Sequence, residues 1–115
     1  MKTEEIFGNT NSIDFISKRD DIVELLLLCN GFVEGSDENC SVLLEKVGYY
    51  ISYTETADFA RLCENRYRVI SVFFSDKPDE RIIELLYGCR RQAIDSGVLL
   101  RVTISGLPLL FDSGC

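Results

Sequence analysis

The pattern of hydrophobic and polar positions is clearest over residues 66–104, where it predicts a strand, a helix and a second strand. Residues 66–75 predict the first strand, because positions 67–74 are rich in β-branched and aromatic side chains, which is typical of a strand inside a sheet. Residues 78–96 carry apolar side chains at helical spacing. That stripe consists of Ile82, Leu86, Cys89 and Ala93. Gly97 is placed to end the helix, and residues 98–104 alternate as a half-buried strand does.

The chain before residue 66 shows the same two periods. Residues 12–17 alternate between apolar and polar, and residues 22–29 are apolar almost throughout, as in a strand buried on both faces. A charged turn joins them, so we predict a hairpin. Residues 38–54 then predict the first helix, with Ser36 or Asp37 as its cap. One face of that helix carries Cys40, Leu44, Val47 and Ile51. Residues between this helix and the central strand fit either a continued helix or a loop.

The order strand, strand, helix, strand, helix, strand predicts an α+β fold. We expect a two-layer sandwich (ββαβαβ), with two helices on one face of a mixed or mainly antiparallel four-stranded sheet. Residues 12–104 would form a single domain, and residues 1–11, which lack periodicity, a flexible N-terminal arm. Residues 105–115 would be an apolar C-terminal tail docked on the domain or on a second subunit. The side chains of this tail that would also serve a homodimer contact are Leu107, Leu109, Leu110 and Phe111.

Composition narrows the class of protein. The 115 residues are 46% hydrophobic, and no apolar run is long enough to span a membrane. Acidic residues near the N-terminus are unlike a signal peptide, so we expect a cytoplasmic protein without membrane association. The five cysteines lack Cys-x-x-Cys spacing and are interpreted as reduced thiols, with Cys29 and Cys89 in the core. A four-cysteine zinc site is the less favoured interpretation, and no cofactor is expected.

The net charge of −7 argues against nucleic-acid binding, since 12 basic residues are scattered among 19 acidic ones. An acidic surface is compatible with a basic protein partner. The alternative interpretation is that the charge only keeps the protein soluble. The predicted partner-binding residues are Glu34, Asp37, Glu38, Asp76, Asp79 and Glu80.

The chain contains no histidine and no glycine-rich phosphate loop, which excludes histidine-based triads and the common nucleotide sites. We therefore predict a non-enzymatic protein-interaction domain, such as an immunity protein or an antitoxin-like inhibitor. One alternative is a small-molecule-binding or enzymatic domain that uses Asp14, Tyr50 or a cysteine. A second alternative is a homodimeric structural module.

Two segments carry a resemblance to known proteins. They are Ser-Ile-Asp-Phe-Ile at residues 12–16 and Leu-Leu-Glu-Lys-Val-Gly-Tyr-Tyr-Ile at residues 43–51. With the later strand, helix and strand, the chain resembles a short bacterial family of unknown function over residues 12–104. The resemblance implies a bacterial cytosolic α+β domain, and it implies no site residues.

Overall fold

Five strands form one mixed sheet in the computed structural model, which describes residues 3–105 and 107–108. The sheet order is β1-β2-β3-β4-β5. The three central strands are parallel, and both outer pairs are antiparallel. Along the chain the elements are α1 (Thr3–Phe7), β1 (Phe15–Arg19), β2 (Ile22–Cys29), α2 (Asp37–Tyr53), α3 (Ala57–Cys63), β3 (Tyr67–Phe74), α4 (Glu80–Asp95), β4 (Leu99–Ile104) and β5 (Leu107–Pro108).

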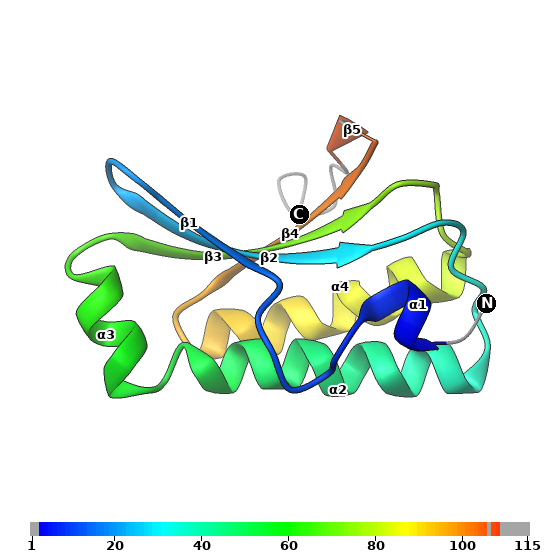
Figure 1. Ribbon diagram of the computed structural model, residues 1–115, viewed down its shortest axis with the longest axis horizontal. Helices are drawn as coiled ribbons and strands as arrows, with labels where there is room; N and C mark the ends of the chain where they lie inside the picture. Colours follow the sequence, from blue (N-terminus) through cyan, green and yellow to red (C-terminus); the bar gives the residue numbers. More distant parts are fainter. Residues whose placement is uncertain (1–2, 106, 109–115) are drawn as a thin grey trace.

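The helices lie on one face of this sheet, and α2 and α4 run side by side beneath it (Figure 1). The predicted two-layer α+β sandwich with the order ββαβαβ is therefore confirmed, and the sheet is of the mixed kind. The structure adds the two-residue β5 and the short helices α1 and α3. The stretch whose structure the sequence left open thus contains a helix, capped by the Thr56 hydroxyl accepting from the Phe59 amide.

Local sequence signals fix several boundaries. The Ser36 hydroxyl caps α2 by accepting from the Asn39 amide at 3.1 Å. Gly97 has φ +78°, the left-handed conformation expected after a helix. The first strand lies later than predicted, because Arg19 pairs with Ile22 across a tight turn.

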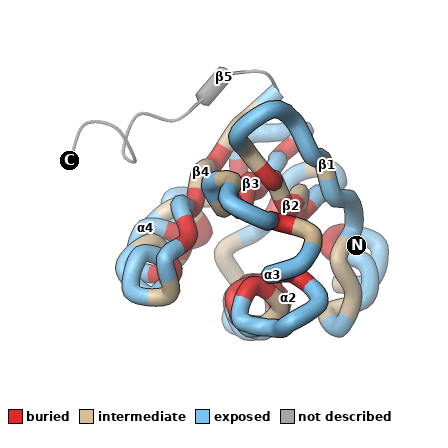
Figure 2. The backbone as a smooth tube through the Cα atoms, turned by 90° about the vertical axis from the view of Figure 1, so that its left-hand side faces the viewer, coloured by how far each residue is buried: buried red, intermediate tan, exposed pale blue. Residues whose placement is uncertain are grey.

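The core lies between the sheet and the helices, where buried positions face one another (Figure 2). The sheet contributes Leu25, Leu27, Ile70, Val72 and Leu100, and the helices contribute Leu43, Val47, Tyr50, Ile82 and Leu86. Burying each large apolar side chain is worth about 1.5–3 kcal/mol relative to exposure. The prediction that residues 22–29 are buried on both faces is wrong. Within the described residues, the helices cover one face of the sheet, and Leu28 on the opposite face is 44% exposed.

The N-terminal segment is also better ordered than expected. Residues 3–7 form α1, and Ile6 and Phe7 are buried in the core. The Asn30 amide donates to the Ile6 carbonyl oxygen at 3.0 Å, so α1 is fixed to the end of β2. The prediction of a flexible arm is therefore wrong for this segment, because two adjacent apolar side chains anchor it.

At the other end, the backbone of β5 pairs with residues 103–104 of β4. Leu107 belongs to this strand, whereas Leu109, Leu110 and Phe111 lie outside the described residues, so the predicted docking of the tail remains a prediction. Among the residues that the structure describes, no helix is long and apolar enough to cross a membrane.

Candidate functional site

The predicted acidic residues gather at one end of the molecule. Because β2 and β3 are parallel, the loops that follow them leave the same edge of the sheet, and α2 and α4 both begin there (Figure 1). The two loops are joined directly. The Asp79 amide donates to the Val33 carbonyl oxygen at 3.1 Å, and the Gly35 amide donates to Asp79 Oδ2 at 2.7 Å.

Arg81 adds a second connection between these loops. Its guanidinium donates to the Gly35 carbonyl oxygen and to Asp37 Oδ1, both at 2.8 Å. The hydrogen bond to Asp37 is the main cause that raises the pKa of Arg81 above its ordinary value. A Cβ atom on Gly35 would lie 3.0 Å from Arg81 Cβ and 3.3 Å from Asp79 Cβ, so the close approach of the loops requires glycine there. The two halves of the acidic surface are therefore held in a fixed relation.

We use the name acidic end for this surface, which consists of Phe32, Glu34, Asp37, Glu38, Asp76, Lys77, Asp79, Glu80 and Arg81. Its six carboxylates and two basic groups leave a net charge of −4, more than half of the −7 of the whole chain. Five of the six predicted carboxylate residues are exposed, whereas Asp79 is turned toward Gly35. Asp79 thus positions the loops and is not presented to solvent like the others.

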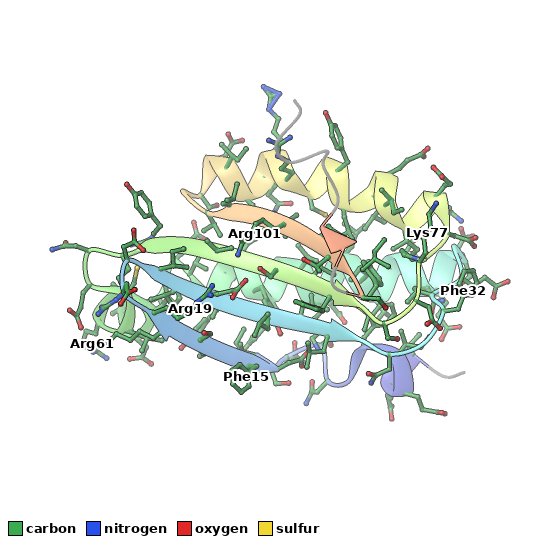
Figure 3. All side chains as sticks on the ribbon, turned by 90° about the horizontal axis from the view of Figure 1, so that it is seen from above. Phe15, Arg19, Phe32, Arg61, Lys77 and Arg101 are labelled. Atoms are coloured by element: carbon green, nitrogen blue, oxygen red, sulfur yellow. The ribbon has the colours of Figure 1, made fainter. Side chains whose placement is uncertain are left out.

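Phe32 is a member of this surface that sequence reasoning missed. It is 52% exposed in the loop after β2, and Figure 3 shows it at the same end as Lys77. The available signal was a lone aromatic residue between Gly31 and Gly35, outside any periodic segment. An exposed aromatic ring within a charged surface is typical of a binding contact.

A second group of polar side chains surrounds Lys46, which is fully buried. Its Nζ lies 2.7 Å from Asp14 Oδ1 and also donates to the Phe7 carbonyl oxygen. Asp14 Oδ2 accepts from the Leu28 amide at 2.9 Å. The Tyr50 hydroxyl donates to the Leu26 carbonyl oxygen at 2.7 Å and accepts from the Asp14 amide at 2.8 Å. These bonds join α1, β2, α2 and the segment before β1.

The structure therefore brings together Asp14 and Tyr50, the two residues named for an enzymatic alternative, with Cys29 close enough to interact electrostatically with Lys46 and Asp14. Burial raises the pKa of Cys29 from its ordinary value of 9.0 to about 12, and burial also raises that of Tyr50. Both groups are protonated at neutral pH, and Cys29 is therefore a poor nucleophile. Asp14 is an exposed residue, as expected, but its side chain is only 19% exposed because it is held by Lys46 and the Leu28 amide. The network supports a role in holding the fold together.

The cysteines of the described chain, Cys29, Cys40, Cys63 and Cys89, are all buried and reduced. Cys115 lies outside the described residues. Within residues 3–105, no group of three or more His, Cys, Asp or Glu side chains is placed to hold a metal ion.

The uncovered face of the sheet carries a third cluster, centred on Glu24. Arg19 Nη2 donates to Glu24 Oε1 at 3.2 Å and Arg101 Nη2 donates to Oε2 at 2.9 Å, while the Ser71 hydroxyl also donates to Oε2. Both arginines lie on the face turned toward the viewer in Figure 3. Exposed apolar side chains surround them: Phe15, Leu28, Tyr67, Phe73 and Leu99. Such a mixed face is a second surface on which a ligand or partner can bind.

Comparison with known proteins assigns no family to the chain. No protein-family model matches it, and no curated protein matches it. A crystal structure described as "Crystal Structure Analysis of Mglu" is similar, with 17% identity and a TM-score of 0.44. The match covers 81% of this chain but only 20% of that one. A likeness this distant carries no argument about function.

Proposed function

We propose that this protein is a non-enzymatic interaction domain of the bacterial cytoplasm that binds a basic protein partner through the acidic end. An immunity protein or an antitoxin-like inhibitor is the class that fits best. The observation that carries the proposal is the joining of residues 32–38 and 76–81 into one surface of net charge −4.

The electrostatic part of the proposal rests on complementarity. An acidic patch speeds encounter with a basic partner and disfavours acidic competitors, and both effects weaken as salt rises. Exposed single ion pairs add little affinity, so the charges mainly set the rate of association and its specificity.

The affinity of the proposed complex would come from Phe32. Aromatic side chains that enter a pocket of the partner dominate many interfaces, and their replacement by alanine costs about 2 kcal/mol or more. The bonds of Gly35 and Arg81 fix the neighbouring loops before binding. Less conformational entropy is then lost when the complex forms.

The test is co-expression with the product of the neighbouring gene, followed by pull-down at low and high salt. The triple variant E34Q/E38Q/E80Q removes three exposed charges and leaves Asp37 and Asp79, which have structural contacts, unchanged. The matched control E55Q/D58N/D95N also removes three exposed charges, but away from the acidic end. We expect the wild type and the control to retain the partner and the triple variant to lose it.

The variant F32A tests the aromatic anchor separately. Because Phe32 is 52% exposed, its removal should leave the free energy of unfolding unchanged within about 0.5 kcal/mol. Binding should nevertheless weaken by roughly 30-fold, the equivalent of 2 kcal/mol. Absence of any salt-sensitive partner, or equal loss in the triple variant and its control, would contradict the proposal.

A further inference from the structure

A groove lies at the start of β3 and β4, remote from the acidic end, with a volume of about 440 Å³. Its lining includes the apolar side chains of Ile22, Tyr67, Val69 and Leu99, together with Arg68 and Arg101. The guanidinium of Arg68 lies over the Phe59 ring and donates to the Thr54 carbonyl oxygen, so Arg101 is the arginine considered for the ligand. This volume is within the range of about 300–1,000 Å³ that small-molecule sites occupy. Most such sites are likewise apolar with one or a few polar groups that orient the ligand.

The register of the sheet explains why the groove is there. β3 begins at Tyr67, but its first partner on β4 is Leu99, which pairs with Val69. Two residues of β3 therefore extend past the start of β4. Gly97, at φ +78°, turns the chain from α4 into β4 beside this extension, and a Cβ atom added there would meet nothing within 4 Å. The hollow is thus built from strand register and a glycine turn.

The charge beside the groove is positive. Arg19, Glu24 and Arg101 form one cluster in which a single carboxylate faces two guanidinium groups, leaving +1. The Glu24 side chain is 12% exposed, whereas that of Arg101 is 39% exposed. A guanidinium has five N–H donors, and Nη2 is the atom of Arg101 that contacts Glu24 in the described structure. Arg101 therefore presents further donors beside an apolar surface, in a protein of net charge −7.

We propose that this groove binds a small monocarboxylate with an apolar body, of the fatty-acid type. The body lies against Tyr67, Val69 and Leu99, and the carboxylate accepts hydrogen bonds from Arg101. Arginine matches a carboxylate in geometry as well as charge. The site is separate from the acidic end and does not depend on the function proposed for it.

The experiment titrates the ¹⁵N-labelled full chain with octanoate and, separately, with 1-octanol, and follows the amide signals by NMR. We expect octanoate to shift the signals of Tyr67, Val69, Leu99 and Arg101, and to bind about tenfold more tightly than octanol, as one charge-assisted hydrogen bond predicts. R101Q should reduce octanoate affinity to that of octanol without changing octanol binding. R101K, which keeps the charge, should retain part of the preference.

R61Q is the matched control, because it removes one exposed arginine of α3 that pairs with Asp58 and does not line the groove. It should bind octanoate like the wild type. Equal affinity for octanoate and octanol, or unchanged octanoate binding in a folded R101Q, would overturn the proposal. A concentration-dependent dimer that occupies the groove in the absence of ligand would overturn it as well.

Discussion

Replacing Asp14 by asparagine should destabilise the protein far more than a surface substitution does. Lys46 is fully buried, and Asp14, at 2.7 Å, is its ion-pair partner in the described structure. D14N keeps the size of the side chain but only one acceptor oxygen, so the negative charge is lost and either Lys46 Nζ or the Leu28 amide also loses its acceptor. The Lys46 ammonium then stays in the core beside the Phe7 carbonyl oxygen without a counter-charge.

The magnitude follows from the burial of the two partners. Removing one member of a buried ion pair costs about 3–5 kcal/mol. The Asp14 side chain is 19% exposed, so some water reaches the pair, and we expect the lower end, about 3 kcal/mol. Domains of this size are stable by only about 5–15 kcal/mol, and the midpoint of thermal unfolding should fall by roughly 10 °C.

The assay is urea unfolding followed by circular dichroism, applied to a double-mutant cycle. K46M removes the buried charge itself and should cost about 1–3 kcal/mol, through the unsatisfied Phe7 carbonyl oxygen and the Asp14 carboxylate left without its partner. D14N/K46M should then cost clearly less than the two single changes together. E45Q, an exposed change one residue away, is the control and should stay within about 0.5 kcal/mol of the wild type. A cost below about 1 kcal/mol for D14N, or strict additivity in the cycle, would refute the reasoning.

Three further predictions concern other parts of the chain. Burial raises the pKa of the Cys29 thiol from 9.0 to about 12. As the pH rises, the unfolded state therefore loses this proton before the folded state does. The free energy of unfolding should thus fall above pH 9, by up to about 1.4 kcal/mol per pH unit from this group, and urea unfolding of C29A should show a shallower fall. G97A should cost about 1–2 kcal/mol because φ is +78° with open space around the Cβ, whereas G48A, also in open space but within α2, should stabilise by about 0.5–1 kcal/mol. Thermal unfolding with the same sign for both glycine changes would contradict this. The homodimer alternative predicts that ending the chain at Ser105 halves the mass measured by light scattering, and an unchanged mass rules out a dimer held by the tail.

The fold was largely predictable because its elements carry strong periodic signals. Residues 22–29 became β2 with the predicted bounds, and the strand predicted at residues 66–75 became β3, one residue shorter at each end. The apolar stripe of α4 is buried as its spacing predicts. The weaker signals belonged to short segments. Five residues of α1 and seven of α3 are too few to show helical periodicity, so their structure depends on tertiary contacts.

The candidate sites were predictable only in part. Acidic residues before and within the first turn of each helix are expected from capping and the helix dipole. They form one surface because β2 and β3 are parallel, so that the loops after both strands lie at the same edge of the sheet. Lys46 follows Glu45 on α2 and has the sequence appearance of a solvent-exposed residue. Its partner Asp14 is 32 residues earlier, and nothing local in the chain indicates that the two meet.

The bond between Lys46 and the carbonyl oxygen of Phe7 also has a consequence for synthesis on the ribosome. The two residues are 39 positions apart, and chains grow at about 5–20 residues per second. The segment that becomes α1 therefore leaves the ribosome roughly 2–8 seconds before the lysine that anchors it does. During that interval Ile6 and Phe7 have no finished core to enter, and they are available to chaperones that bind short apolar segments of nascent chains.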